Sequence, residues 1–167
     1  MIDINFIPIF NDKEFITATE EYETIWAKDG EGIFKTLESI TDLKFKEDRI
    51  AVLVYEGISY SGRNSQDIMR LRASYDSAVK KGTLVHELSH RLLFGFKTST
   101  AEEDHLVLNL FLYDSWITLY GIEFADMMVA VESKRTDMYK NAWEHTLQMT
   151  DKERREEFSN LKQLQSE

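Results

Sequence analysis

The first part of the chain carries a hydrophobic pattern with the period of an α-helix. Apolar side chains recur at steps of three and four residues between positions 11 and 40, at Phe15, Ala18, Tyr22, Ile25, Trp26 and Ile33. This spacing places them on one face of a helix, where they can pack against a core. Gly30 and Gly32 interrupt the pattern. Because glycine weakens a helix interior, we expect a break between two helices there.

Two short segments in the middle of the chain have the pattern of β-strands. Residues 49–55 contain the apolar and β-branched run Ile50-Ala51-Val52-Leu53-Val54. Residues 68–73 alternate apolar and polar side chains, which is typical of a strand with one buried face. The residues between them, 57–64, are rich in Gly, Ser and Asn and predict a turn.

From about Ala78 onward the pattern is helical to the C-terminus. Gly95 is expected to end the first of these helices, and Ser99 or Thr100 to begin the next. Each of these two residues is followed three positions later by a glutamate that can complete a capping box. Gly121 predicts a further stop, and the mixed charges of residues 151–157 are typical of a solvated helix face. The pattern therefore predicts an α+β fold with a predominantly helical C-terminal half.

Composition and charge narrow the classes of protein. The 167 residues are 43% hydrophobic and 12% aromatic, which suits one folded domain spanning residues 1–167. The formal net charge of −10 argues against nucleic acid and against a membrane surface as partners. No apolar run approaches the roughly 18 residues of a membrane span, and without cysteine there is no thiolate metal site. The N-terminus lacks a basic region typical of a signal peptide, so a cytoplasmic location is expected.

One short motif indicates a chemistry. Residues 86–90 read His86-Glu87-Leu88-Ser89-His90, and apolar residues at helical spacing surround them. Positions i and i+4 of a helix lie one above the other, so His86 and His90 can hold one metal ion. The Glu87 carboxylate can then take a proton from a metal-bound water without binding the metal itself. The alternative is a surface helix with two ordinary histidines and a solvated glutamate.

Over residues 84–94 the chain resembles the active-site helix of the zincin superfamily of metallopeptidases. The resemblance implies zinc (Zn²⁺) held by His86 and His90, with Glu87 as general base. The longer metzincin pattern is absent, because Leu93 stands at its glycine position and Phe96 at its third histidine position. The chain is more similar to the small intracellular gluzincins, in which the third ligand lies on a following helix.

The resemblance also implies a fold and a way of holding substrate. It implies a small zincin-like domain in which a short, mostly antiparallel sheet packs on the active-site helix. In zincins an edge strand just before this helix commonly pairs with extended substrate, and residues 69–74 could be that strand. An ordinary hairpin strand is the alternative.

A third metal ligand is expected on the helix that follows. The connection after Gly95 is short, so the two helices should be antiparallel neighbours, and the residue level with His90 falls near His105. Asn109, one turn further, would be available to orient a ligand. Three acids compete with His105: Glu102, Glu103 and Asp104. The resemblance favours Glu102 or Glu103, whereas helix capping explains these acids without a metal.

These residues predict a zinc-dependent peptidase that acts on a peptide or protein substrate. Three protein ligands and one open position define a catalytic zinc site. Glu87 would activate the zinc-bound water and then protonate the leaving amine. The alternative is a non-catalytic zincin-like binding or regulatory protein with a structural metal. Candidates for stabilising the oxyanion are Tyr113, Tyr120, Tyr139 and His145. Glu132, which follows an apolar run, is expected on a helix surface.

Overall fold

The computed structural model describes residues 2–165, and these form two compact units. Of the described residues, 2–38 and 43–94 form the first unit, and 39–42 and 95–165 form the second. The sequence predicts a single domain, and whether the two units act as one domain stays a prediction. Among the described residues, no helix is long and apolar enough to cross a membrane.

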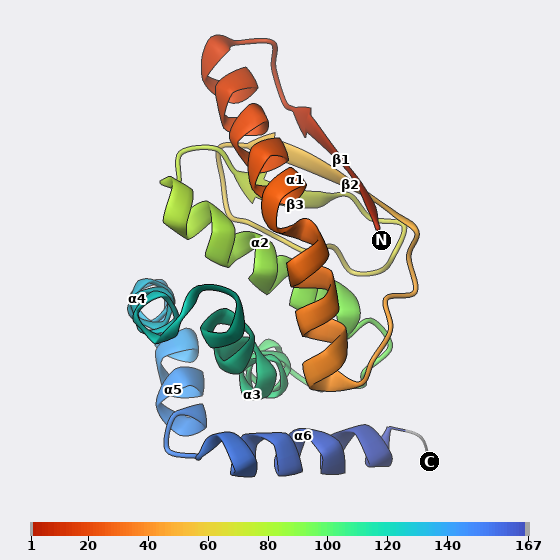
Figure 1. Cartoon of the computed structure of the whole chain (residues 1–167), viewed down its shortest axis with the longest axis vertical. Coiled ribbons are helices and arrows are strands. Elements are labelled where there is room, and N and C mark those ends of the chain that lie inside the picture. The colour runs from red at the N-terminus through yellow and green to blue at the C-terminus, as the bar shows by residue number, and fades with distance from the viewer. Residues whose placement is uncertain (1, 166–167) are drawn as a thin grey trace. The chain divides into compact units, whose positions relative to one another are not determined.

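The first unit is built on a three-stranded parallel sheet with the order β1-β2-β3 (Figure 1). Its strands are β1 (Asp3–Pro8), β2 (Arg49–Tyr55) and β3 (Met69–Arg72), and both neighbouring pairs are parallel. The prediction of a mostly antiparallel sheet is therefore wrong. The physical reason is the long helix between β1 and β2, because such a crossover returns the chain to the same edge and makes neighbouring strands parallel.

The helix α1 (Lys13–Thr41) is continuous, so the predicted break at Gly30 and Gly32 is also wrong. A Cβ atom added at Gly30 would lie 2.7 Å from the ring of Trp26, so the glycine makes room for the indole. Burial compensates for the weak helix propensity of the two glycines, which cost about 1 kcal/mol each relative to alanine. The buried side chains of α1 include Tyr22, Ile25, Ile33 and Leu37.

Contacts of Tyr22 join α1 to the sheet. Its ring stacks on Phe6 of β1 with 6.0 Å between the centroids, and its hydroxyl donates a hydrogen bond of 2.9 Å to the Arg72 carbonyl oxygen at the end of β3. The alternating burial of β2 supplies the opposing apolar face through Ile50, Val52 and Val54. The core of the first unit therefore lies between α1 and one face of the sheet.

The outer edge of β3 is occupied by the turn that precedes it. The Tyr60 and Arg70 backbones exchange two hydrogen bonds of 2.9 and 2.8 Å in an antiparallel bridge. The Arg72 backbone N–H donates to the Ser59 hydroxyl at 3.2 Å. Because these backbone groups are already bonded, the structure favours an ordinary structural strand over a substrate-pairing edge at these positions.

The helix α2 (Ser77–Leu92) follows β3 and carries the histidine motif. Asp76 caps its first turn, and its carboxylate accepts a hydrogen bond of 2.9 Å from the Val79 N–H. Lys80 forms an ion pair with Glu21 of α1, and its ammonium lies 5.4 Å from the centre of the Tyr22 ring. These contacts fix the N-terminal half of α2 against α1.

The second unit contains four helices, coloured green to blue in Figure 1. They are α3 (Ala101–Tyr120), α4 (Ile122–Glu132), α5 (Asp137–Thr146) and α6 (Asp151–Leu164). The central helix α3 contacts each of the other three. Trp116 of α3 stacks on Trp143 of α5 with centroids 5.6 Å apart, and Phe111 meets Phe158 of α6 edge to face at 5.1 Å. These aromatic pairs form the core of the unit.

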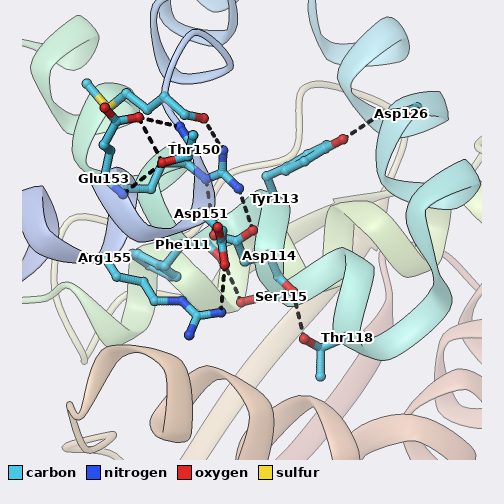
Figure 2. Close-up of polar contacts among 12 residues, drawn as sticks. Phe111, Tyr113, Asp114, Ser115, Thr118, Asp126, Thr150, Asp151, Glu153 and Arg155 are labelled. Atoms are coloured by element: carbon cyan, nitrogen blue, oxygen red, sulfur yellow. Dashed lines mark hydrogen bonds and ion pairs between the residues drawn. The ribbon is translucent and has the colours of Figure 1, made fainter.

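Polar contacts fix the ends of these helices (Figure 2). Thr150 and Glu153 form a capping box at the start of α6, and Gly121 ends α3 with a φ of 90°. The predicted helix stop at Gly121 is confirmed. The predicted solvated helix face of residues 151–157 is also confirmed, and Asp151 and Arg155 form an exposed ion pair there at 3.7 Å. Inside the unit, the Arg154 guanidinium donates hydrogen bonds of 3.1 and 2.6 Å to the two carboxylate oxygens of Asp114.

Candidate metal centre

The helix α2 brings His86 and His90 together in the way that the motif predicts. Their Nε2 atoms lie 3.1 Å apart, and the rings are tilted by 60° with centroids separated by 4.9 Å. His86 is 1% exposed, and His90 is partly buried. The surface helix and solvated glutamate of the alternative interpretation are wrong, since α2 is buried over most of its length and Glu87 is 4% exposed.

The separation of the two nitrogens suits one shared ion. Two Zn–N bonds at a tetrahedral angle place their nitrogens about 3.3 Å apart. Two neutral imidazole lone pairs at 3.1 Å repel one another unless a proton or a cation lies between or beside them. The pair can thus share one proton or bind a metal ion, and both states use the same nitrogen atoms.

Glu87 follows His86 on the same helix and is 4% exposed. Successive helical residues are turned by about 100°, so its carboxylate projects from a different side of α2 than the imidazoles. The helix α2 thus carries two imidazoles and, on the residue after His86, a buried carboxylate. A buried carboxylate in this place can exchange a proton with a water near the histidines.

The last turn of α2 is held by a buried guanidinium group. Arg91 donates hydrogen bonds of 3.1 and 2.7 Å to the two carboxylate oxygens of Glu47. Its Nη1 also donates to the carbonyl oxygens of Ser61, Asn64 and Asp67, at 2.6, 3.4 and 3.0 Å. Burial raises the pKa of the Glu47 carboxyl, and the neighbouring guanidinium opposes this rise. Arg91 thereby fixes the backbone immediately after His90.

His105 lies near the start of α3, in the second unit, and is 8% exposed. Its Nδ1 lies 2.7 Å from the Ala101 carbonyl oxygen. A carbonyl oxygen can only accept, so Nδ1 carries the hydrogen and Nε2 presents a lone pair. Histidines that bind metals commonly have this arrangement. The His105 ring also meets the Tyr139 ring, with centroids 4.4 Å apart. His86, His90 and His105 are thus the histidines that could supply metal ligands.

The acids that compete with His105 have different surroundings. Glu103 accepts a hydrogen bond of 2.6 Å from the Ser99 N–H and donates its own N–H to the Thr100 hydroxyl at 3.1 Å. Helix capping therefore accounts for Glu103. Glu102 is exposed in the first turn, whereas Asp104 is partly buried.

The four candidates for oxyanion stabilisation also differ. The Tyr113 hydroxyl donates a hydrogen bond of 2.7 Å to Asp126, as Figure 2 shows. Tyr120 packs on Phe124 with centroids 4.6 Å apart, and His145 is exposed. Tyr139 contacts a predicted ligand, because its ring lies against that of His105.

Tyr113 is expected to ionise at a higher pH than an ordinary tyrosine. Burial and the Asp126 carboxylate raise its pKa to about 12. A raised pKa favours the neutral phenol in the folded state, so this contribution to stability is present below pH 10 and lost as the pH rises toward 12. Absorbance titration should show a tyrosine ionisation near pH 12. That transition should vanish in Tyr113→Phe and move to lower pH in Asp126→Asn; an unchanged titration in both variants would contradict this assignment.

The sequence analysis did not predict the buried contacts of two charged residues, Arg91 and Glu132. Arg91 has no sequence signal, because Glu47 is distant in the chain and their pairing depends on the fold. Glu132 is not on a helix surface as expected but is 0% exposed. It accepts a hydrogen bond of 3.0 Å from the Trp143 indole N–H and lies 3.9 Å from the Arg135 guanidinium. The apolar run before Glu132 was the signal for its burial.

No family model, curated protein or solved structure matches the chain. The chemistry of this protein is therefore inferred from its own side chains.

Proposed function

We propose that this protein is a zinc-dependent peptidase in which α2 supplies two metal ligands and the general base. The observation that carries the proposal is the 3.1 Å separation of the His86 and His90 Nε2 atoms, on a buried helix in which Glu87 directly follows His86. Two imidazoles and an adjacent carboxylate are the parts that metal-assisted hydrolysis of a peptide bond requires.

Zinc is the metal that we assign to this site. Imidazole nitrogen suits zinc, copper, iron and nickel, so the two histidines do not select zinc by themselves. A carboxylate next to the first histidine favours hydrolysis over redox chemistry, and zinc is the usual ion for hydrolysis at an H-E-x-x-H helix. The lack of cysteine removes the thiolate ligands of most structural zinc sites.

His105 is our choice for the third ligand. The hydrogen bond from its Nδ1 to the Ala101 carbonyl oxygen, at 2.7 Å, leaves Nε2 available as a metal-binding atom. Glu103 is already used in the cap of α3.

The chemistry divides between the ion and the chain. Zinc, when bound, acts as a Lewis acid that makes water more acidic and polarises a carbonyl group. Glu87 accepts the proton of the attacking water and delivers it to the leaving amine. Tyr139, through its contact with His105, is the candidate that donates a hydrogen bond to the oxyanion.

Substitutions on α3 test the third ligand. His105→Ala should weaken zinc binding by at least tenfold, because removing one of three ligands or its orientation has effects of about this size or larger. Glu102→Ala and Glu103→Ala should leave zinc affinity unchanged. Competition with a chromophoric zinc chelator measures all three variants against the wild type. Wild-type affinity in His105→Ala, together with a loss in either glutamate variant, would transfer the third ligand to that acid.

A further inference from the structure

A second feature of the first unit is a polar groove beside β3. Its volume is about 670 Å³, and it is lined by Tyr60, Arg63, Asn64, Gln66, Asp67, Ile68 and Arg70. We call this feature the arginine groove. Most of its lining comes from the turn between β2 and β3, and Arg70 projects from β3 itself.

Two arginines of this groove have no acidic partner. The chain has eight arginines, and six of them form ion pairs with carboxylates: Arg49, Arg72, Arg91, Arg135, Arg154 and Arg155. The side chains of Arg63 and Arg70 make neither a hydrogen bond nor an ion pair with any described residue, and both are exposed. In a chain with a formal net charge of −10, carboxylates are plentiful. Two unpaired guanidinium groups in one groove therefore point to an anionic ligand from outside the chain.

The one acid in the groove does not neutralise these arginines. The Asp67 carboxylate accepts a hydrogen bond of 2.8 Å from the Arg63 backbone N–H, and so holds the turn rather than a guanidinium group. The Asn64 side chain accepts another of 2.8 Å from the Gln66 N–H.

The turn is also anchored from within the unit. Arg91 donates to the carbonyl oxygens of Ser61 and Asp67 at 2.6 and 3.0 Å. Gly62, with a φ of 96°, permits this approach, because a Cβ atom there would lie 2.9 Å from Arg91 Nη1. A groove whose backbone is fixed before binding loses little conformational entropy when a ligand binds.

Apolar side chains beside the arginines indicate the class of ligand. Tyr60 is 39% exposed and Ile68 is 48% exposed, although both are large and hydrophobic. Arginine and tyrosine are enriched among the residues that dominate protein–protein interfaces. A ligand that satisfies the whole groove carries both carboxylates and apolar side chains, which is the chemistry of an acidic peptide. A peptide, unlike nucleic acid, can bring an aliphatic side chain to Ile68 as well as carboxylates to the arginines.

We propose that the arginine groove binds an acidic peptide segment, with its carboxylates on Arg63 and Arg70 and an apolar side chain against Tyr60 and Ile68. As a substrate groove this rests on the proposed peptidase function, because the turn is bonded to Arg91, the residue after His90. It makes acidic peptides the substrate class. Binding itself does not depend on a metal ion.

Fluorescence anisotropy with a labelled peptide tests the proposal. The full chain carrying Glu87→Gln, which should hydrolyse the probe far more slowly than the wild type, is titrated against a short peptide that alternates Glu and Leu. The same peptide with Gln in place of Glu is the neutral probe. The acidic peptide should bind at least tenfold more tightly than the neutral one, and added salt should reduce the difference.

Arginine variants locate the site. Arg63→Gln and Arg70→Gln should each weaken binding by about tenfold, and together by about a hundredfold. Arg49→Gln is the matched control, because Arg49 is exposed and lies on the same sheet, paired with Asp3 at 3.6 Å. Circular dichroism should show that all variants are folded.

Several results would overturn the proposal: no detectable binding, equal binding of the acidic and neutral peptides, unchanged affinity in the double variant, or tighter binding of a single-stranded oligonucleotide. The peptidase function fails separately. If the protein binds acidic peptides through Arg63 and Arg70 but hydrolyses none, the peptidase function is contradicted and the arginine groove is supported. If it hydrolyses peptides with no preference for acidic ones, the peptidase function is supported and the groove is contradicted as a substrate site.

Discussion

Glu87→Gln is expected to lower kcat/KM for peptide hydrolysis by about 10²–10⁴-fold while leaving zinc binding intact. The amide has nearly the same shape as the carboxylate but cannot accept the proton of the attacking water. Glu87 is 4% exposed, so the isosteric change also preserves packing around α2. Hydrolysis of a fluorogenic peptide library and zinc content should be measured on the same preparation.

The control for this variant is Glu23→Gln, which changes an exposed glutamate on α1 and should leave both activity and zinc unchanged. Wild-type activity in Glu87→Gln would contradict the assignment of the general base. Loss of zinc from Glu87→Gln would instead make Glu87 a ligand, which the proposed division of roles does not allow.

Arg91→Ala is expected to lower the free energy of unfolding by about 3–5 kcal/mol, because it leaves a buried charge without its partner. The Arg91 side chain is 1% exposed and that of Glu47 is 5% exposed. The variant loses both hydrogen bonds to Glu47 and the bonds that hold the turn before β3. Urea denaturation at several pH values measures the effect.

The pH dependence identifies the cause of this loss. Burial already raises the pKa of Glu47, and without the guanidinium group the pKa should rise further. A raised folded-state pKa means that the protonated acid is favoured on folding, so the variant should recover stability below the ordinary glutamate pKa and lose it as the pH rises. The decrease in the free energy of unfolding caused by Arg91→Ala should therefore be smaller near pH 5 than near pH 7.

Two comparisons keep this prediction testable. Arg49→Ala breaks an exposed ion pair and should cost less than about 1 kcal/mol. The double variant Arg91→Met with Glu47→Leu should be more stable than Arg91→Ala, because it removes both charges. A cost of Arg91→Ala as small as that of Arg49→Ala would show that the buried network does not stabilise the unit.

Local patterns in the sequence predicted the elements that depend on local spacing. The strand over residues 49–55 and the stop at Gly121 are confirmed, since an apolar β-branched run and a glycine cap act within a few residues. The pairing of His86 with His90 is confirmed for the same reason, because the helix alone fixes an i, i+4 pair.

Features that depend on distant residues were not predictable in this way. The direction of the strands is set by the crossover through α1, and β1 was not foreseen although Ile4 and Phe6 alternate with polar residues. The break predicted at Gly30 is wrong, because the buried side chains of α1 hold the helix against the core on both sides of the glycine. Burial of Glu132 likewise depends on Trp143, a residue of another helix. In each case a tertiary contact outweighs a local preference.

The metal content of the purified protein tests the central proposal most directly. It should be measured by atomic emission on a chain without a metal-binding tag, beside His86→Ala, His90→Ala and the exposed control His145→Ala. We expect about one zinc ion per chain in the wild type and in His145→Ala, as one catalytic site requires, and little or none in the other two variants. A wild-type protein that binds no zinc after reconstitution at neutral pH, or that keeps its zinc in His86→Ala and His90→Ala, would contradict the proposed metal centre.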